Sequence, residues 1–598
     1  MPLLSGEPAR PKVLVPEKLS QDGLALLKTT LDVEERRGLG AEELLDIIPK
    51  YEALLVRSET KVTAEVLQAG KNLKVVARAG VGVDNVDVAA ATKLGIVVIN
   101  SPSGNVGAAA EHTIALMLSM ARNIADAGSS LKAGKWERSR LVGVEVNGKT
   151  LGIIGLGKVG LIVARLAKGL GMKVNALDPY ASPAVASAAS VNLVPSLAAL
   201  LPTVDFLTIH TPLIASTKGM ISTAELSQMK RGARILNVAR GGTIDEVALL
   251  EALESGHLAG AAVDVFTSEP PVADSSASKL IAHPRVVATP HLGASTVEAQ
   301  ENVSIDVCEQ VLQILGGALP RSAVNAPLIL PEEYKKLQPF VHLVEKIGSL
   351  YTQHYTSSAT FTANRNTFDL IYEGEISGIN NTKPLFAALI KGLIAPISSS
   401  AGVNVNIVNA ELIARERGIV INEQHSRDPS SHSYSSLVTL VARPPSRASS
   451  RAPPGASGST TPRKITPEQQ QIISGTCSQS QPLISRLGRF ATSFVPEGTL
   501  LICHNYDSPG KIGVVGSILG KESVNINFMG VAPVSKSLLE GEDRGDISEG
   551  KMLSDVNESY EPDKEALMIL GVDKAVGENV AKALVQEGGV LSASVISL

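Results

Sequence analysis

Residues 150–160, Thr-Leu-Gly-Ile-Ile-Gly-Leu-Gly-Lys-Val-Gly, decide the fold of this chain. An apolar run leads into Gly155-x-Gly157-x-x-Gly160, and apolar residues at helical spacing follow as far as Leu170. In a strand–turn–helix unit the first glycine permits a tight turn, the second lets the backbone approach a pyrophosphate, and the third lets helix and strand pack closely. The helix N-terminus then offers free N–H groups and a positive dipole end to the phosphates. The stretch therefore predicts a dinucleotide-binding unit.

An acidic residue at the end of the next apolar run indicates which dinucleotide is bound. Residues 173–177 form that run, and Asp178 follows it. A carboxylate about twenty residues past the glycines accepts hydrogen bonds from the ribose hydroxyls of NAD. Its charge would repel the 2′-phosphate of NADP, so the sequence favours NAD as cofactor.

Length and composition bound the class of protein. The chain has 598 residues, enough for three or four domains, and it is 44% hydrophobic and 19% charged, as a globular protein is. Its net charge of −4 gives no basic bias toward nucleic acid or anionic membranes. No uninterrupted apolar run reaches the roughly 18 residues of a membrane span. The N-terminal residues lack the apolar core of a signal peptide. The three cysteines have neither metal-site nor disulfide spacing, so we expect a cytoplasmic protein without a metal site.

Strand-like apolar runs alternate with helical patterns from residue 12 to about residue 292, which is typical of an α/β fold with parallel sheets. Ligands of such sheets lie at the carboxyl ends of the strands. Arg57 with Ser58, Arg78 and Asn100 stand at three such ends. We expect these residues to bind an anionic substrate, with arginines that merely cap strands at the surface as the alternative.

Three later strand ends carry Arg240, Glu269 and His291. An imidazole can take a hydroxyl proton as hydride leaves, because its pKa lies near the working pH. A carboxylate beside it would orient the ring, and an arginine can hold a substrate carboxylate through its bidentate fork. The set predicts redox chemistry on a 2-hydroxy acid. By contrast, His112 lies among apolar residues and is interpreted as a structural histidine.

Five motifs between about residues 12 and 325 resemble those of the D-2-hydroxyacid dehydrogenase family. The resemblance implies that Arg240, Glu269 and His291 are catalytic. It also implies two Rossmann-like lobes, a discontinuous substrate-binding domain (1–103 and 295–325) and an NAD-binding domain (104–294). The motifs are Gly-Val-Gly-Val-Asp-Asn-Val at 80–86, the glycine turn at 155–160, Asn-Val-Ala-Arg-Gly-Gly at 237–242, Asp-Val-Phe with Glu-Pro-Pro at 264–271, and Thr-Pro-His-Leu-Gly-Ala-Ser-Thr at 289–296.

The same resemblance assigns the residues that contact NAD. Two of them depart from the family pattern: Val81 stands where related enzymes often have Thr, and Val238 stands where Cys or Thr is common. The set is Val81, Gly155, Gly157, Lys158, Val159, Gly160, Asp178, Thr211, Val238, Ala239, Arg240, Asp264, His291, Leu292, Gly293 and Ala294.

Residues 134–138, Gly-Lys-Trp-Glu-Arg, resemble the family segment that reaches the active site of a neighbouring subunit. Trp136 would then anchor a homodimer formed through the NAD-binding domain, unless it packs within its own subunit. Arg138 would reach a substrate phosphate of the neighbour. A homotetramer is the larger assembly that the resemblance allows.

The character of the sequence changes after residue 325. A helical pattern at 334–350 and strand-like runs at 356–363, 367–372, 403–408 and 437–441 predict an α+β intervening domain over 326–497. A Ser/Pro/Arg-rich insert at about 443–463 has almost no large apolar residue, so we expect it to be disordered.

Residues 498–598 show a βαββαβ pattern with an Asp507-x-Pro509-Gly510 turn, which resembles the ferredoxin-like ACT regulatory domain. By that resemblance Asn505, Asp507 and Asn525 bind serine as an effector. The acidic stretch at 540–564 exceeds the usual hairpin and has no functional interpretation.

Taken together, the resemblance implies NAD-dependent oxidation of 3-phospho-D-glycerate to 3-phosphohydroxypyruvate, the first step of L-serine biosynthesis, with feedback by serine. Two alternatives stay open. One is a dehydrogenase for another 2-hydroxy acid, such as glycerate or glyoxylate. The other is an NAD-sensing binding protein like the transcriptional corepressors that share the fold.

Overall fold

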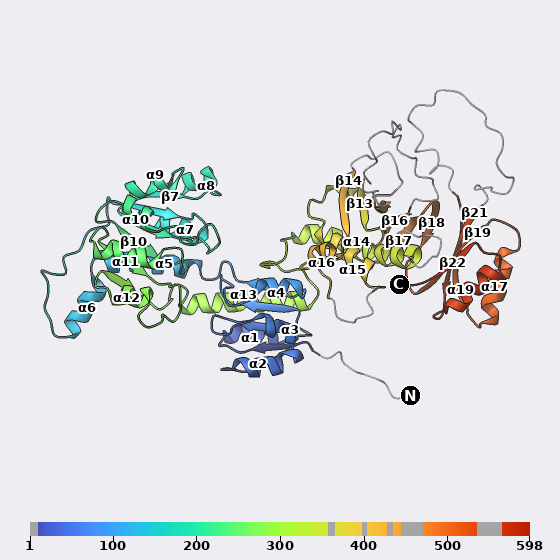
Figure 1. Ribbon diagram of the computed structural model, residues 1–598, viewed down its shortest axis with the longest axis horizontal. Coiled ribbons are helices and arrows are strands. Elements are labelled where there is room, and N and C mark those ends of the chain that lie inside the picture. The colour runs from blue at the N-terminus through green and yellow to red at the C-terminus, as the bar shows by residue number, and fades with distance from the viewer. Residues whose placement is uncertain (1–9, 357–364, 398–403, 427–433, 444–470, 535–564) are drawn as a thin grey trace, which may run out of the picture. The chain divides into compact units, whose positions relative to one another are not determined.

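The structure is a computed structural model that describes residues 10–356, 365–397, 404–426, 434–443, 471–534 and 565–598. The chain forms two compact units (Figure 1). The first contains residues 1–87 and 98–324, and the second contains residues 88–97 and 325–598.

A five-stranded sheet forms the first lobe of the first unit. Its order is β2-β1-β3-β4-β5, and β1 to β4 pair in parallel. This is a doubly wound order with its switch point between β1 and β3, where such sheets bind ligands. The strands are β1 (Lys12–Val15), β2 (Asp32–Glu35), β3 (Ala53–Val56), β4 (Val75–Arg78) and β5 (Val97–Asn100), and the first helices are α1 (Gln21–Lys28), α2 (Ala41–Ile47) and α3 (Ala64–Ala69).

The chain returns to this lobe through the long helix α13 (Val297–Leu315), which packs against α1 (Figure 1). The two helices approach closely at Gly23, where an added Cβ would lie 3.1 Å from the Sγ of Cys308. A segment far along the sequence therefore completes the lobe.

A seven-stranded parallel sheet forms the second lobe, in the order β12-β11-β10-β9-β6-β7-β8. Read from β8, this is the 3-2-1-4-5-6 order of dinucleotide-binding folds. Apolar clusters cover the sheet, and helix α5 (Val106–Ala121) packs on α7 (Lys158–Gly169). The strands are β6 (Thr150–Ile154), β7 (Lys173–Leu177), β8 (Asn192–Leu193), β9 (Phe206–Ile209), β10 (Arg234–Asn237), β11 (Gly260–Val263) and β12 (Val286–Ala288). The other helices are α6 (Ile124–Lys132), α8 (Pro183–Ala188), α9 (Leu197–Leu200), α10 (Thr223–Gln228), α11 (Glu246–Glu254) and α12 (Ser276–Ala282).

The second unit contains a six-stranded sheet in the order β14-β13-β15-β16-β17-β18. Helices α14 (Pro331–Tyr351) and α15 (Lys383–Ile394) pack so closely that a Cβ added at Gly392 would lie 2.0 Å from the carbonyl oxygen of Glu345. Only glycine fits at this point of contact. The strands are β13 (Thr367–Gly374), β14 (Val420–Ser426), β15 (Ser436–Arg443), β16 (Gln471–Ser478), β17 (Gln481–Leu487) and β18 (Phe490–Phe494), with α16 (Ala410–Glu416) before β14.

A four-stranded antiparallel sheet ends the chain, in the order β20-β21-β19-β22. With one helix after its first strand and one after its third, the expected βαββαβ ferredoxin-like order is confirmed. The elements are β19 (Thr499–Tyr506), α17 (Lys511–Lys521), β20 (Ile526–Pro533), β21 (Glu565–Val572), α19 (Glu578–Gln586) and β22 (Ser592–Ser597). One apolar core runs across both sheets of this unit and includes Tyr351 from α14 and Ile502 from β19.

One expectation about this unit is wrong. Residues 404–408 of the run at 403–408 do not form a strand: they lead into a turn before α16, because Asn406 and Asn409 accept backbone N–H groups with their side chains. Strand β14 and strands β16 to β18 were not expected. Most of the 356–363 run, the 443–463 insert beyond Arg443 and the 540–564 stretch lie outside the described residues.

Helix α4 (Val88–Lys93) groups with the second unit, where the carbonyl oxygen of Gly95 accepts a hydrogen bond from Nδ2 of Asn406 at 2.7 Å. Among the helices of the described segments, none is both long and apolar enough to cross a membrane.

Candidate active site

The three glycines of the turn between β6 and α7 meet three different surroundings. Gly155 has φ of +92°, and a Cβ there would lie 2.6 Å from the carbonyl oxygen of His210. A Cβ on Gly160 would lie 2.2 Å from the carbonyl oxygen of Gly155. At Gly157 an added Cβ would meet no described atom within 4 Å. Two glycines are therefore required by packing, and the third leaves space at the start of α7, where a pyrophosphate fits.

Asp178 follows β7 at the edge of this turn. Its Oδ2 accepts a hydrogen bond from the N–H of Leu156 at 2.7 Å, and its Oδ1 accepts one from the N–H of Tyr180 at 2.8 Å. The carboxylate is thus fixed beside the glycine turn, as a ribose partner must be. The hydroxyl of Thr211, after β9, is buried without a hydrogen-bond partner among the described residues, so it can serve a ligand.

His291 and Glu269 form the closest ionisable pair at the carboxyl end of the same sheet. Nδ1 of His291 lies 2.6 Å from Oε2 of Glu269, and Oε1 of Glu269 accepts the N–H of Phe266 at 2.9 Å. Burial raises the pKa of Glu269, but the hydrogen bonds from His291 and Phe266 outweigh it and leave this pKa lowered. The carboxylate stays ionised and can orient the ring, with Nε2 of His291 available for a proton.

Asp264, after β11, organises the loop that carries His291. It is fully buried and accepts hydrogen bonds from the hydroxyl of Thr289 at 2.6 Å and from the N–H groups of Leu292 and Gly293 at 2.7 and 2.9 Å. Nε2 of His112, on α5, lies 3.2 Å from the same carboxylate. Burial raises the pKa of Asp264, yet these hydrogen bonds together lower it.

Arg240 reaches from the second lobe to the first. Its Nε lies 3.2 Å from Oδ2 of Asp84, and its Nη1 donates to the carbonyl oxygen of Ala239 at 2.7 Å. A Cβ on Gly82 would lie 2.1 Å from Nη2 of Arg240. The glycine loop after β4 is therefore shaped to admit this guanidinium.

Arg78, on the first lobe, lies near enough to Arg240 of the second for their charges to interact. Its Nε donates to Oδ1 of Asn85 at 3.1 Å and to the carbonyl oxygen of Arg57 at 3.3 Å. Burial lowers the pKa of Arg78, and the positive charges of Arg240 and Arg57 lower it further. The charges of three arginines from two lobes thus act on one another at Arg78, which favours an anionic ligand nearby.

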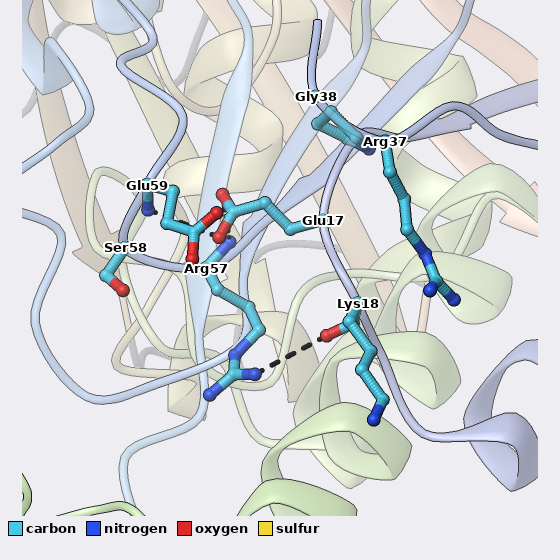
Figure 2. A pocket seen from close by; sticks show the side chains of 8 residues that line it. Glu17, Lys18, Arg37, Gly38, Arg57, Ser58 and Glu59 are labelled. Carbon is cyan, nitrogen blue, oxygen red and sulfur yellow. Dashed lines mark hydrogen bonds between the residues drawn. The ribbon is translucent and has the colours of Figure 1, made fainter.

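Of the other residues predicted to bind the substrate, Asn100 and Ser58 lie at strand ends of the first lobe, and Arg138 lies on an exposed segment of the second. The amide of Asn100 donates to the carbonyl oxygen of Val81, which ties the end of β5 to the glycine loop. Ser58 lies beside Arg57 after β3 (Figure 2). Arg138 is exposed, and Trp136 is 78% exposed. The alternative that Trp136 packs within its own subunit is therefore wrong.

Some residues predicted to contact NAD make hydrogen bonds to other parts of the protein. Nζ of Lys158 donates to the hydroxyl of Ser103 at 2.6 Å. Val238 is buried after β10, and the N–H of Ala239 donates to Oδ1 of Asn237 at 3.2 Å. Val81, Val159 and Ala294 lie in the glycine loop, in α7 and after His291.

The predicted effector residues lie in the second unit. Asn505 is buried at the end of β19, and its Oδ1 has no partner among the described residues. Asp507 and Asn525 are exposed, and the N–H of Asn525 donates to Oδ1 of Asp573 at 3.0 Å.

Sequence reasoning missed one neighbour of the site. Asp84 belongs to the glycine-loop motif after Arg78, but its partner Arg240 comes from the other lobe. His112 was interpreted as structural, and its contacts with Asp264 and Thr289 at 3.2 Å fit that interpretation. The described residues contain no cluster that could hold a metal ion.

Comparisons with known proteins agree with this geometry. Residues 114–293 match the family model "D-isomer specific 2-hydroxyacid dehydrogenase, NAD binding domain", and residues 336–460 match "D-3-phosphoglycerate dehydrogenase intervening domain". The chain is 43% identical to D-3-phosphoglycerate dehydrogenase 3, chloroplastic, from Arabidopsis thaliana, over 96% of this chain and 90% of that protein. It is 42% identical to D-3-phosphoglycerate dehydrogenase of Synechocystis over 87% of each, and 37% identical to that of Bacillus subtilis over 98% and 99%.

Proposed function

Because the chain belongs to the D-3-phosphoglycerate dehydrogenases within the D-2-hydroxyacid dehydrogenase family, we propose that it oxidises 3-phospho-D-glycerate to 3-phosphohydroxypyruvate with NAD. This reaction is the first step of L-serine biosynthesis. The observation that carries the proposal is the contact between Nδ1 of His291 and Oε2 of Glu269 at the carboxyl end of the dinucleotide sheet.

His291 is the proposed base. Its ring takes the proton of the substrate's 2-hydroxyl, and the carboxylate of Glu269 stabilises the imidazolium that forms. Arg240 holds the substrate carboxylate through its bidentate fork and polarises the forming oxo group. Bound NAD supplies the hydride acceptor.

The proposed NAD site fits the groups that the second lobe presents. The open Gly157 and the start of α7 receive the pyrophosphate, and Asp178 receives the ribose diol. The unpartnered hydroxyl of Thr211 and the loop around Asp264 hold the nicotinamide end. Lys158, Val159, Val238, Ala239 and residues 291–294 complete the site, and Val81 borders it from the first lobe.

The proposed substrate site uses Arg57, Ser58, Arg78 and Asn100. The arginines favour a substrate with a second anionic group, because burial, together with the positive charges of Arg240 and Arg57, lowers the pKa of Arg78, and an anion nearby would offset that repulsion. This observation favours the phosphorylated acid over glycerate or glyoxylate.

A homodimer through the NAD-binding domain belongs to the same proposal. Trp136 and Val142 are each 78% exposed, and Leu131 is 58% exposed in the same segment. Three exposed large apolar side chains in one short segment suit a protein contact. The segment is held in shape by Arg140, which pairs with Asp126 at 2.6 Å. Arg138 would then reach the neighbouring active site.

Serine is the proposed effector of the C-terminal domain, at Asn505, Asp507 and Asn525. The buried, unpartnered Oδ1 of Asn505 supports a ligand there. Replacing Asp507 and Asn525 together by Ala should weaken serine binding at least tenfold, since each charge-assisted hydrogen bond contributes roughly 1.5–3 kcal/mol. Calorimetric titration with serine measures this loss. Equal affinity of wild type and double variant would misplace the site.

The proposed domain limits are 1–103 with 295–325 for the substrate, 104–294 for NAD, 326–497 for the intervening domain and 498–598 for the ACT domain. We place the enzyme in the cytoplasm, because all three cysteines are free thiols, as in a reducing compartment.

One assay tests the function directly. NADH formation is measured with 3-phosphoglycerate, glycerate and lactate, each with and without serine. We expect the phosphorylated acid to be oxidised most efficiently and serine to slow its oxidation. Preference for glycerate would support the dehydrogenase alternative, and no turnover with any acid would support the binding-protein alternative.

A further inference from the structure

The loop that carries His291 is held by a single residue at the end of β11. Three consecutive backbone N–H groups, those of residues 291–293, donate to Asp264: the first to its carbonyl oxygen at 2.9 Å, and the other two to its carboxylate at 2.7 and 2.9 Å. The hydroxyl of Thr289 donates to the same carboxylate at 2.6 Å. The position of the proposed base therefore depends on the direction in which the side chain of Asp264 points.

The donors of the loop do not fix that direction by themselves. If the carboxylate of Asp264 rotated, the N–H groups and the hydroxyl of Thr289 would follow it, and the loop would move as a whole. A donor outside the loop is needed to select one rotamer of Asp264. Among the hydrogen bonds that this carboxylate makes to described residues, the one from His112 on α5 is the only one that comes from elsewhere in the chain.

Helix α5 is a firm support for His112. Ala110 and Met117 of this helix are fully buried in the apolar core that also covers α7. The ring of His112 is not part of that core: its side chain is 19% exposed, and its Nε2 lies 3.2 Å from both Oδ1 of Asp264 and Oγ1 of Thr289. A helix fixed by apolar packing thus presents one polar group to the loop.

The two partners of Nε2 determine which ring nitrogen of His112 carries a proton. Thr289 uses its single hydroxyl proton in the 2.6 Å bond to Asp264, so its oxygen can only accept from the ring. Burial raises the pKa of Asp264, but hydrogen bonds from His112, Thr289 and the loop lower it, so the ionised carboxylate can only accept as well. We therefore assign a proton to Nε2, where it is shared between the two oxygens.

We propose that His112 is a positioning residue of the reaction: through its Nε2–H it fixes the carboxylate of Asp264, and with it the loop that places the ring of His291 for proton transfer. The inference rests on the proposed function, in which His291 is the base. It adds to the site a residue that lies outside all five sequence motifs. Because His112 acts through Asp264, its loss should slow proton transfer rather than weaken substrate binding, which falls to the arginines.

The test uses the full-length enzyme and three substitutions of His112 that differ in where they place a donor. The amide nitrogen of Gln lies about where Nε2 of His lies, so His112→Gln keeps the donor. His112→Asn carries the same amide on a shorter side chain, which places it near the position of Nδ1 and out of reach, so it is the matched control. His112→Leu removes the donor altogether.

NADH formation from 3-phosphoglycerate is followed in a single turnover at saturating NAD and substrate, so that product release does not mask the chemical step. Steady-state measurements give KM for 3-phosphoglycerate, and the thermal midpoint of each variant reports on folding.

We expect the single-turnover rate to fall at least about tenfold in His112→Leu and His112→Asn, the scale of one hydrogen bond to a charged group, and to stay within about threefold of wild type in His112→Gln. KM for 3-phosphoglycerate should change less than about threefold in all three variants, because a positioning residue of this kind acts on the chemical step.

An unchanged rate in His112→Leu and His112→Asn overturns the inference, and so does an equal loss in His112→Gln and His112→Asn. A rise in KM for 3-phosphoglycerate without a fall in the rate contradicts it as well. If His112→Leu does not fold, the comparison of the Gln and Asn variants decides alone. Wild type that forms no NADH from 3-phosphoglycerate would instead overturn the proposed function itself.

Discussion

His291 is fixed in an uncommon backbone conformation. Its φ of +52° lies in the left-handed region, which residues other than glycine seldom adopt. Its N–H donates to the carbonyl oxygen of Asp264 at 2.9 Å, and its ring contacts Glu269. Strain of this kind persists where the surroundings determine a side chain's position, as at a catalytic site.

Replacing His291 by Ala should therefore remove the proton acceptor and leave the NAD site in place. We expect turnover with 3-phosphoglycerate to fall more than about a hundredfold, the usual scale of general base catalysis. NAD affinity, measured by calorimetry, should stay near wild type. His342→Ala, at an exposed position on α14, is the control. Near-normal turnover in His291→Ala would contradict the assignment of His291 as the base.

Glu269→Gln should slow the reaction while leaving the ring of His291 in place. The lowered pKa of Glu269 keeps its carboxylate ionised at neutral pH, 2.6 Å from the ring. The amide keeps the shape of the side chain but removes the charge that orients the ring and stabilises the imidazolium formed in the reaction. Turnover with 3-phosphoglycerate should therefore fall about tenfold or more. Unchanged turnover would show that Glu269 does not act through His291.

At the scale of elements, continuous apolar runs predicted the parallel strands well. β1, β3 and β9 are almost wholly buried, and burial on both faces leaves little ambiguity in such runs. The strands of the second unit were harder to predict from the sequence. The run at 403–408 alternates apolar residues with Asn as a strand would, but the Asn side chains bind local backbone and form a turn. β16 contains Ser, Gly and Thr with an irregular register at Ser474, so its sequence carries little strand signal.

Sequence alone proposed Arg240, Glu269 and His291 because each follows a strand end, and the structure brings His291 and Glu269 into contact at 2.6 Å. Contacts between lobes could not be predicted, because no local pattern tells which acid Arg240 meets on the other lobe. The contact between Asp84 and Arg240, and that between His112 and Asp264, are evident only from the structure.

The turn between β6 and α7 gives a prediction that separates packing from binding. Gly160→Ala should destabilise the fold, because its Cβ would overlap the carbonyl oxygen of Gly155 at 2.2 Å. Gly157→Ala meets open space, so the thermal midpoint should stay near wild type while NAD affinity falls at least about tenfold. Gly169→Ala, also without close neighbours, is the control. Unchanged NAD affinity in Gly157→Ala would place the pyrophosphate elsewhere.

At the scale of the whole molecule, each unit contains a half-buried histidine whose pKa is lowered by burial. Burial lowers the pKa of His210, in the first unit, to about 4. In the second unit burial lowers the pKa of His354 to about 4, and Nδ1 of His354 lies 2.8 Å from the hydroxyl of Ser594 on β22. This contact joins the helical turn after α14 (Thr352–Thr356) to the four-stranded sheet, so protonation of His354 affects how that turn and the sheet hold together.

The fold should therefore lose stability on acidification before its carboxylates titrate. A histidine whose pKa is near 6.5 when unfolded and about 4 when folded binds more protons in the unfolded state between those values, so its contribution is fully present above pH 6.5 and is lost as pH falls toward 4. Between pH 7 and pH 5 we expect a loss of up to about 2 kcal/mol for each such histidine. Urea unfolding at both pH values measures the loss, and His354→Asn should make it smaller, whereas His342→Asn at an exposed site should not. A decrease in stability that is identical in wild type and His354→Asn would show that the ring of His354 is already solvated.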